Sequence, residues 1–172
     1  MDDPTTLPEL ISTFTYWITH TTQKIHLASH RAQKLFEDTN KMRYDYTVGR
    51  RALIRSGFDV SSTPLDASMI LNEDLRPEQI VMLQALLNLR GLVERREVIR
   101  SQVENQINDL GVIRGRLIMM LEELREMEAR IGGDEVDEGR LAHAAGVIDA
   151  VEIIDAMQNE AATEIETGVQ QN

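Results

Sequence analysis

The chain has 172 residues, 42% of them hydrophobic but only 4% aromatic, so a core built from Leu, Ile, Val, Met and Ala favours packed helices over a sheet sandwich. Cysteine is absent, which excludes a disulfide framework, a thiolate metal site and a cysteine nucleophile. The net charge of −11 is uneven, because residues 20–55 hold eight Lys/Arg against three Asp/Glu, whereas residues 122–172 hold three against fourteen.

The first predicted helix covers about residues 7–55. Thr6 and Glu9 have the spacing of a capping box, and apolar residues then recur with a period of about 3.5. The stretch ISTFTYWITHTT, residues 11–22, is rich in Thr and aromatic residues and could alone form a strand. The helical spacing of its large apolar residues favours a helix.

A connector with a short helix is expected over residues 56–75. The short helix should open at Thr63 and Pro64, with Asp66 at its third position. Apolar residues along the connector indicate that it packs against the long helices.

The second predicted helix, about residues 76–131, is the central element of the chain. Fifteen positions with heptad spacing form a seam along this helix. Eleven of them hold apolar residues, which is typical of a coiled-coil-like helix. At the rise of an α-helix this segment would be ~80 Å long. A compact globule of this chain length would be only ~40 Å across. The sequence therefore predicts an all-α, elongated helical hairpin.

A third helix is expected over about residues 136–165, followed by a disordered tail over 166–172. Together the segments form one predicted elongated domain, residues 1–172.

Two glycines and an arginine interrupt the second helix near its middle. Gly111 and Gly115 each cost about 1 kcal/mol relative to Ala in a helix interior, which favours a close approach by another helix over a tolerated kink. Arg114 lies on the seam and needs a carboxylate if another helix covers it. The acidic third helix, or a partner helix, could supply that carboxylate. The predicted partner interface consists of Gly111, Arg114, Gly115, Leu117, Leu121 and Leu124.

An antiparallel hairpin would also bring the end of the first helix beside the start of the second. The residues of this predicted basic end are Lys41, Arg43, Arg50, Arg51 and Arg55. With stacking by Tyr44 and Tyr46, such an end could bind nucleic acid. The overall charge of −11 opposes binding to a polyanion at long range.

The sequence carries few residues arranged for chemistry. His26 and His30 have a spacing that can bind zinc, but a third ligand is missing and the pattern favours solvated or interface histidines. The carboxylates of the second and third helices lack the Glu-x-x-His motifs of a di-iron bundle, which favours a solvated acidic face. We therefore expect no catalytic residue, no metal and no cofactor.

These observations favour a non-enzymatic helical assembly, scaffold or adaptor subunit that binds protein partners as a homodimer or hetero-oligomer. Nucleic-acid binding through residues 41–55 and the start of the second helix is the alternative. No stretch reaches the 18 apolar residues of a transmembrane helix, and the acidic first residues do not resemble a signal peptide. The predicted location is intracellular, in the cytoplasm.

Overall fold

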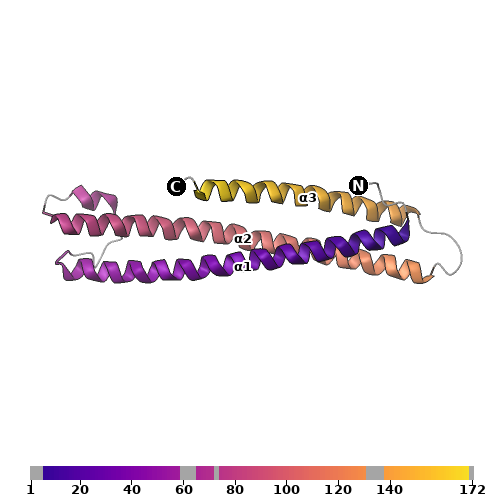
Figure 1. Ribbon diagram of the computed structural model, residues 1–172, viewed down its shortest axis with the longest axis horizontal. Coiled ribbons are helices and arrows are strands. Elements are labelled where there is room, and N and C mark those ends of the chain that lie inside the picture. Colours follow the sequence, from indigo (N-terminus) through magenta and orange to yellow (C-terminus); the bar gives the residue numbers. More distant parts are fainter. Residues whose placement is uncertain (1–5, 59–64, 72–73, 131–137, 171–172) are drawn as a thin grey trace. The chain divides into compact units, whose positions relative to one another are not determined.

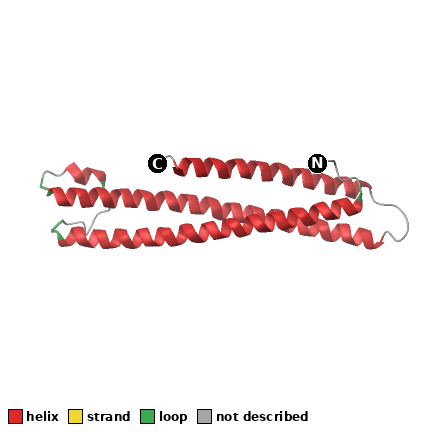
Figure 2. Cartoon of the chain, viewed as in Figure 1, coloured by secondary structure: helices red, strands yellow, loops and turns green. Residues whose placement is uncertain are grey.

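The computed structural model describes the backbone of residues 6–58, 65–71, 74–130 and 138–170. It contains α1 (Leu7–Arg55), a 3₁₀ helix η1 (Ala67–Leu71), α2 (Pro77–Arg130) and α3 (Glu138–Gln170) (Figure 1). The described residues form no strand (Figure 2), so the predicted all-α fold with a long central helix is confirmed. Side chains of α3 are described for residues 139–157 and 159.

Local capping explains both ends of α1. At its start, the Glu9 carboxylate accepts hydrogen bonds from the backbone N–H and the hydroxyl of Thr6, at 3.0 and 2.8 Å. At its end, Gly57 has a φ of 89° and its N–H donates to the Ile54 carbonyl, while the Phe58 N–H donates to the Leu53 carbonyl. This is a Schellman motif, which needs a residue with positive φ at the position of Gly57.

The threonine-rich start of α1 is helical because its hydroxyl groups are satisfied within the helix. Thr15, Thr19 and Thr21 each donate to the carbonyl four residues earlier, at 2.7–2.9 Å. Phe14 and Trp17, from the same segment, are buried. The strand that the composition alone could indicate is therefore not formed.

Two predicted boundaries are corrected. The short helix begins at Ala67 with the Asp66 carboxylate accepting the Ser68 N–H at 2.9 Å, so Asp66 caps it from outside, while Thr63 and Pro64 lie outside the described residues. Residues 166–170, expected in a disordered tail, are the last part of α3. Helix propagation adds one hydrogen bond per residue once the helix is nucleated, which favours continuation.

The chain forms two compact units, and α1 and α2 each contribute to both. Unit 1 comprises Met1–Ile25 and Asn108–Asn172, and unit 2 comprises His26–Ile107. The elongated shape and the single domain inferred from the sequence stay predictions.

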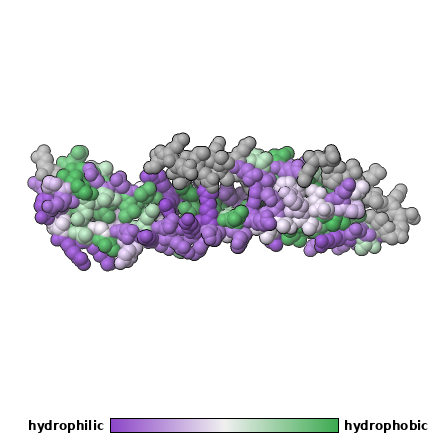
Figure 3. All heavy atoms as spheres, viewed as in Figure 1, coloured by the Kyte–Doolittle hydropathy of each residue, from purple (hydrophilic) through white to green (hydrophobic). Residues whose placement is uncertain are grey.

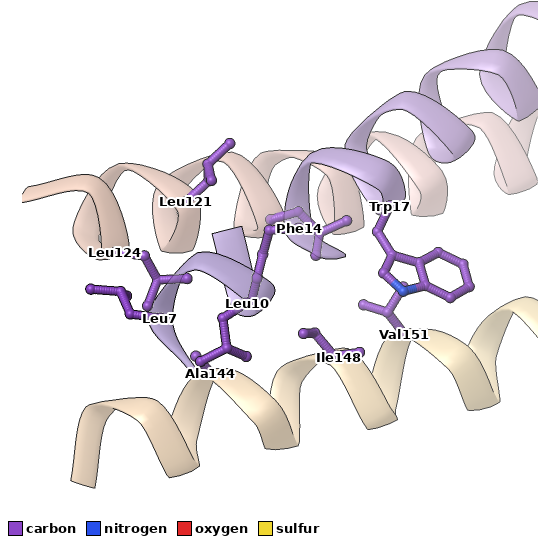
Figure 4. Close-up of a cluster of buried hydrophobic side chains, with 10 residues drawn as sticks. Leu7, Leu10, Phe14, Trp17, Leu121, Leu124, Ala144, Ile148 and Val151 are labelled. Atoms are coloured by element: carbon purple, nitrogen blue, oxygen red, sulfur yellow. The ribbon is translucent and has the colours of Figure 1, made fainter. Parts of the chain in front are cut away.

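Unit 1 is a bundle of three helical segments around one apolar core. Its buried residues come from α1, α2 and α3 (Figure 4) and are Leu7, Leu10, Phe14, Trp17, Leu117, Leu121, Leu124, Ala144, Ile148 and Val151. The Arg114 guanidinium donates to the Thr22 hydroxyl at 2.9 Å, and the Lys24 ammonium contacts the Asp155 carboxylate at 2.5 Å. Leu7 of α1 shares the core with Leu124 and Ala144, whereas Thr22 and Lys24, further along α1, contact Arg114 and Asp155. The direction of α2 is therefore antiparallel to both α1 and α3.

Unit 2 is a helical hairpin closed by the connector. Leu53, Leu65, Leu83 and Leu86 form its buried core. At the closed end, the Gln79 side-chain N–H donates to the Ser56 carbonyl at 3.0 Å, and its oxygen accepts the Arg76 backbone N–H at 3.0 Å. Gln79 thus caps α2 and ties it to the end of α1.

Candidate interaction surfaces

One interaction candidate is a mostly apolar groove of about 590 Å³ between α2 and α3 of unit 1. We call it the α2–α3 groove. Its α2 edge consists of Ile113, Arg116, Met119, Met120 and Glu123. Its α3 edge includes Ala142, Gly146, Val147, Ala150 and Ile154. Most of these side chains are apolar or small, which is typical of surfaces that accept another helix.

The groove is open to solvent although it is mostly apolar. Met119 is 63% exposed and Ile154 is 37% exposed. A Cβ built on Gly146 would meet no atom within 4 Å in the described part of the chain. Figure 3 shows hydrophobic side chains interrupting the hydrophilic surface on the visible face of the molecule. Apolar surface left open in this way marks sites of interaction in many proteins.

One cation and one anion flank the groove on α2. Arg116 and Glu123 are seven residues apart, or about two helical turns, so they lie on the same side of the helix. Both side chains are exposed, and neither has an ion pair or hydrogen bond with a described residue. Met119 and Met120 lie between them.

The predicted partner interface divides into two parts. Leu117, Leu121 and Leu124 are 0%, 7% and 1% exposed and pack against α1 and α3 of the same chain. These three leucines are core residues of unit 1, because α1 and α3 of the same chain cover this part of the α2 seam.

The remaining members of that predicted interface, Gly111, Arg114 and Gly115, are exposed. A Cβ on either glycine would meet no described atom within 4 Å, so no close approach by α3 is seen among the described residues. Arg114 bonds to Thr22 of α1 and to no described carboxylate of α3. An approach by a partner helix at the glycines stays a prediction.

Polar contacts join α1 and α3 on another side of unit 1. The Asp155 carboxylate lies 2.5 Å from Lys24 Nζ and 3.4 Å from His20 Nε2. Lys24 Nζ also donates to the Asn159 side-chain oxygen at 2.7 Å. Lys24 and Asp155 are partly buried, so these contacts fix the position of α3 along α1.

The seam arginines of unit 2 have partners within unit 2. The Arg96 guanidinium contacts the Asp38 carboxylate of α1 at 2.8 Å. Arg100 contacts Glu104 at 2.8 Å and lies 5.0 Å from the centre of the Phe36 ring. As expected for seam arginines that another helix covers, both contact carboxylates, one on α1 and one on α2.

The predicted basic end is only partly a free cationic surface. Arg43 forms an ion pair with Glu97 of α2, and Arg50 is partly buried. Lys41, Arg51 and Arg55 are exposed and have no ion pair with a described residue.

At the start of α2, Arg90 donates to Glu94 and to the Leu65 carbonyl, both at 2.8 Å. The hydrogen bond that Arg90 donates to Glu94, and then the negative charge of Glu94, raise the pKa of Arg90 above its usual value. Arg90 is therefore engaged within unit 2 and adds little to a free cationic surface.

The two histidines predicted to be solvated or at an interface do not form part of a metal site among the described residues. His26 and His30 are exposed, and no group of three or more His, Cys, Asp or Glu side chains in the described residues could hold a metal ion. No described helix combines the length and apolar character needed to cross a membrane.

Compared with protein-family models, with curated proteins and with solved structures, the chain finds no match.

The α2–α3 groove was not predicted from the sequence. One signal for it is present, since Ala142, Gly146 and Ala150 recur at intervals of four residues and therefore lie on one face of α3. Another is the pair of adjacent methionines, Met119 and Met120, because Met is common at adaptable binding surfaces.

Proposed function

We propose that this protein is a non-enzymatic assembly or adaptor subunit, and that the α2–α3 groove of unit 1 binds a helix of a protein partner. The observation that carries the proposal is an open, mostly apolar groove between two antiparallel helices. Helices pack side by side at 8–10 Å when the contact residues allow it. The small residues Gly146 and Ala150 allow a partner helix to come close, and Met119 and Met120 can adapt to its shape.

A single-residue comparison on α3 tests this proposal. Ala150→Glu puts a carboxylate into the groove, whereas Ala156→Glu puts the same group on an exposed position of α3 that does not line it. Affinity-tagged variants are expressed in the native source, and partners are crosslinked and identified. We expect Ala156→Glu to retain the wild-type partners and Ala150→Glu to lose them. Identical partners for both variants would contradict the role of the groove.

A second candidate function, nucleic-acid binding, is supported by one observation. Lys41, Arg51 and Arg55 are exposed without an ion pair in the described residues, and Tyr44 on the same helix is 70% exposed. These groups could combine phosphate contacts with base stacking. Retention on single-stranded DNA or RNA that falls as salt is added, and that is lost in Lys41→Gln/Arg51→Gln/Arg55→Gln, would favour this function.

A further inference from the structure

The charges flanking the α2–α3 groove are arranged so that the groove can face a copy of itself. In a two-fold dimer, each residue i of one copy contacts residue j of the other, and j contacts i. A self-complementary surface therefore has opposite charges at equal distances on either side of its centre. Arg116 and Glu123 meet this condition about a centre between Met119 and Met120.

The α3 edge of the groove has its centre at the same level. Arg114 bonds to Thr22 and Asp155 contacts Lys24, so residues 114 and 155 lie at similar heights along α1. Toward the other end, Leu124 and Ala144 share the core with Leu7 (Figure 4). Because α2 and α3 are antiparallel, Met119 and Met120 of α2 are level with residues 148–149 of α3. Gly146 and Ala150 lie on either side of that level.

We propose that the α2–α3 groove binds the same groove of a second copy of this chain in an antiparallel, two-fold arrangement. This inference rests on the proposed function and names the partner. Arg116 of each copy then faces Glu123 of the other, giving two equivalent ion pairs. Between the pairs, methionines and small residues of both copies form the apolar centre of the interface. Both charges lack partners among the described residues, so pairing across the dimer replaces no contact with any of them.

Reciprocal charge reversal tests the arrangement on the full-length protein. In Arg116→Glu, both positions of the groove carry a negative charge, and in Glu123→Arg both carry a positive charge. Each variant alone then places like charges at both contacts of its dimer. A mixture of the two variants restores opposite charges at both contacts, and so does the double reversal within one chain. All of these positions are exposed, so the variants should fold like the wild type.

Sedimentation velocity over a range of protein concentrations gives the dimer dissociation constant at ~0.15 M salt. We expect each single reversal to weaken the dimer about 10-fold or more, because each of the two charge contacts loses an attraction and gains a repulsion. The equimolar mixture and the double reversal should return to within about 3-fold of the wild type. Glu122→Arg, at an exposed α2 position that does not line the groove, serves as the matched control and should dimerise like the wild type.

Two results would overturn the inference. One is a wild-type protein that stays monomeric at the highest concentration, and the other is a dimer that responds equally to reversal at Glu122 and at Glu123. In either case, the proposed function would still hold if Ala150→Glu lost the crosslinked partners that Ala156→Glu retained. The groove would then bind a different protein and not a second copy of this chain. If the two variants also had identical partners, both the dimer and the proposed function would be contradicted.

Discussion

Unit 1 and unit 2 are both packed helices, but they differ in net charge and in the contacts that join their helices. Unit 1 has six Lys/Arg and eighteen Asp/Glu, a net charge of −12, and its described core is formed by three helical segments. Unit 2 has twelve Lys/Arg and eleven Asp/Glu, a net charge of +1. Its two helices are joined by ion pairs such as Arg43–Glu97 and Arg96–Asp38. In unit 1 a third helix covers the apolar seam of α2, and in unit 2 the seam residues Arg96 and Arg100 contact carboxylates.

The two units also use glycine differently. In unit 2, a Cβ on Gly49 would lie 2.7 Å from Leu86 Cδ2, so the absence of a side chain permits a close contact between α1 and α2. In unit 1, Gly111, Gly115 and Gly146 face open space among the described residues. Gly91 of unit 2 is also open, so the contrast lies between Gly49, which permits close packing of α1 on α2, and Gly146, which lines a groove that another helix could cover.

The largest expected effect comes from placing a charge in the core of unit 1. Leu117→Asp buries a carboxylate at a position that is 0% exposed and should lower the free energy of unfolding by about 3–5 kcal/mol. Val112→Asp, on the same helix at a position that is 58% exposed, should change it by less than about 0.5 kcal/mol. Urea denaturation measures both. Equal losses would mean that the buried face of α2 is assigned wrongly.

The glycine comparison can be tested by two matched substitutions. Gly49→Ala gains about 1 kcal/mol of helix propensity but forces the buried Leu86 to move, an overpacking cost of about 1–3 kcal/mol. Gly111→Ala has the gain without the clash. We expect the stabilities of the two variants, measured by thermal and urea unfolding, to differ by about 2 kcal/mol in favour of Gly111→Ala. Equal stabilisation by both would show that α1 and α2 are not in close contact at Gly49.

A smaller loss is expected at the closed end of unit 2. Gln79 is 6% exposed and bonds to Ser56 and to the Arg76 backbone, so the similarly shaped Gln79→Met should cost about 1–1.5 kcal/mol. Gln84→Met, at an exposed position of α2, is the control. Hydrogen exchange should show faster opening of the first turn of α2 in Gln79→Met only. Unchanged exchange there would contradict the tie between the helix ends.

The smallest effect is expected for the polar contacts between α1 and α3. Asp155→Asn removes the charge that Lys24 contacts and should cost about 0.5–1 kcal/mol, because the pair is only partly buried. The loss should shrink as salt is added, since salt screens the attraction. Asp149→Asn, at an exposed position of α3, should leave stability unchanged. A loss that does not depend on salt would assign the effect to packing and not to charge.

Helix ends could be predicted from the sequence where their signals are local. The capping box of Thr6 and Glu9 and the glycine at position 57 act within one helical turn, so their outcome does not depend on the rest of the fold. The buried seam was predictable for a similar reason, because Leu117, Leu121 and Leu124 follow a helical period.

The surfaces were harder to predict because they depend on which helix covers which face. Arg114 lies on the same seam as Leu117, yet its side chain reaches Thr22 of α1 and stays exposed. The groove was missed because α3 has apolar or small residues on more than one face, including Ile148 inward and Ala150 outward. Periodicity alone cannot choose between such faces, and only the position of α1 decides which one is buried.

The most direct test of the account is hydroxyl-radical footprinting of the associated protein. It compares the oxidation of Met119, in the groove of unit 1, with that of Tyr44, on α1 of unit 2 near Lys41. The two side chains are 63% and 70% exposed. Oxidation is measured by mass spectrometry in dilute and concentrated samples whose sedimentation is known. We predict that Met119 becomes protected from oxidation as the protein associates while Tyr44 keeps its reactivity. Protection of Tyr44 with unchanged oxidation of Met119 would contradict the assignment of the interaction surface to unit 1.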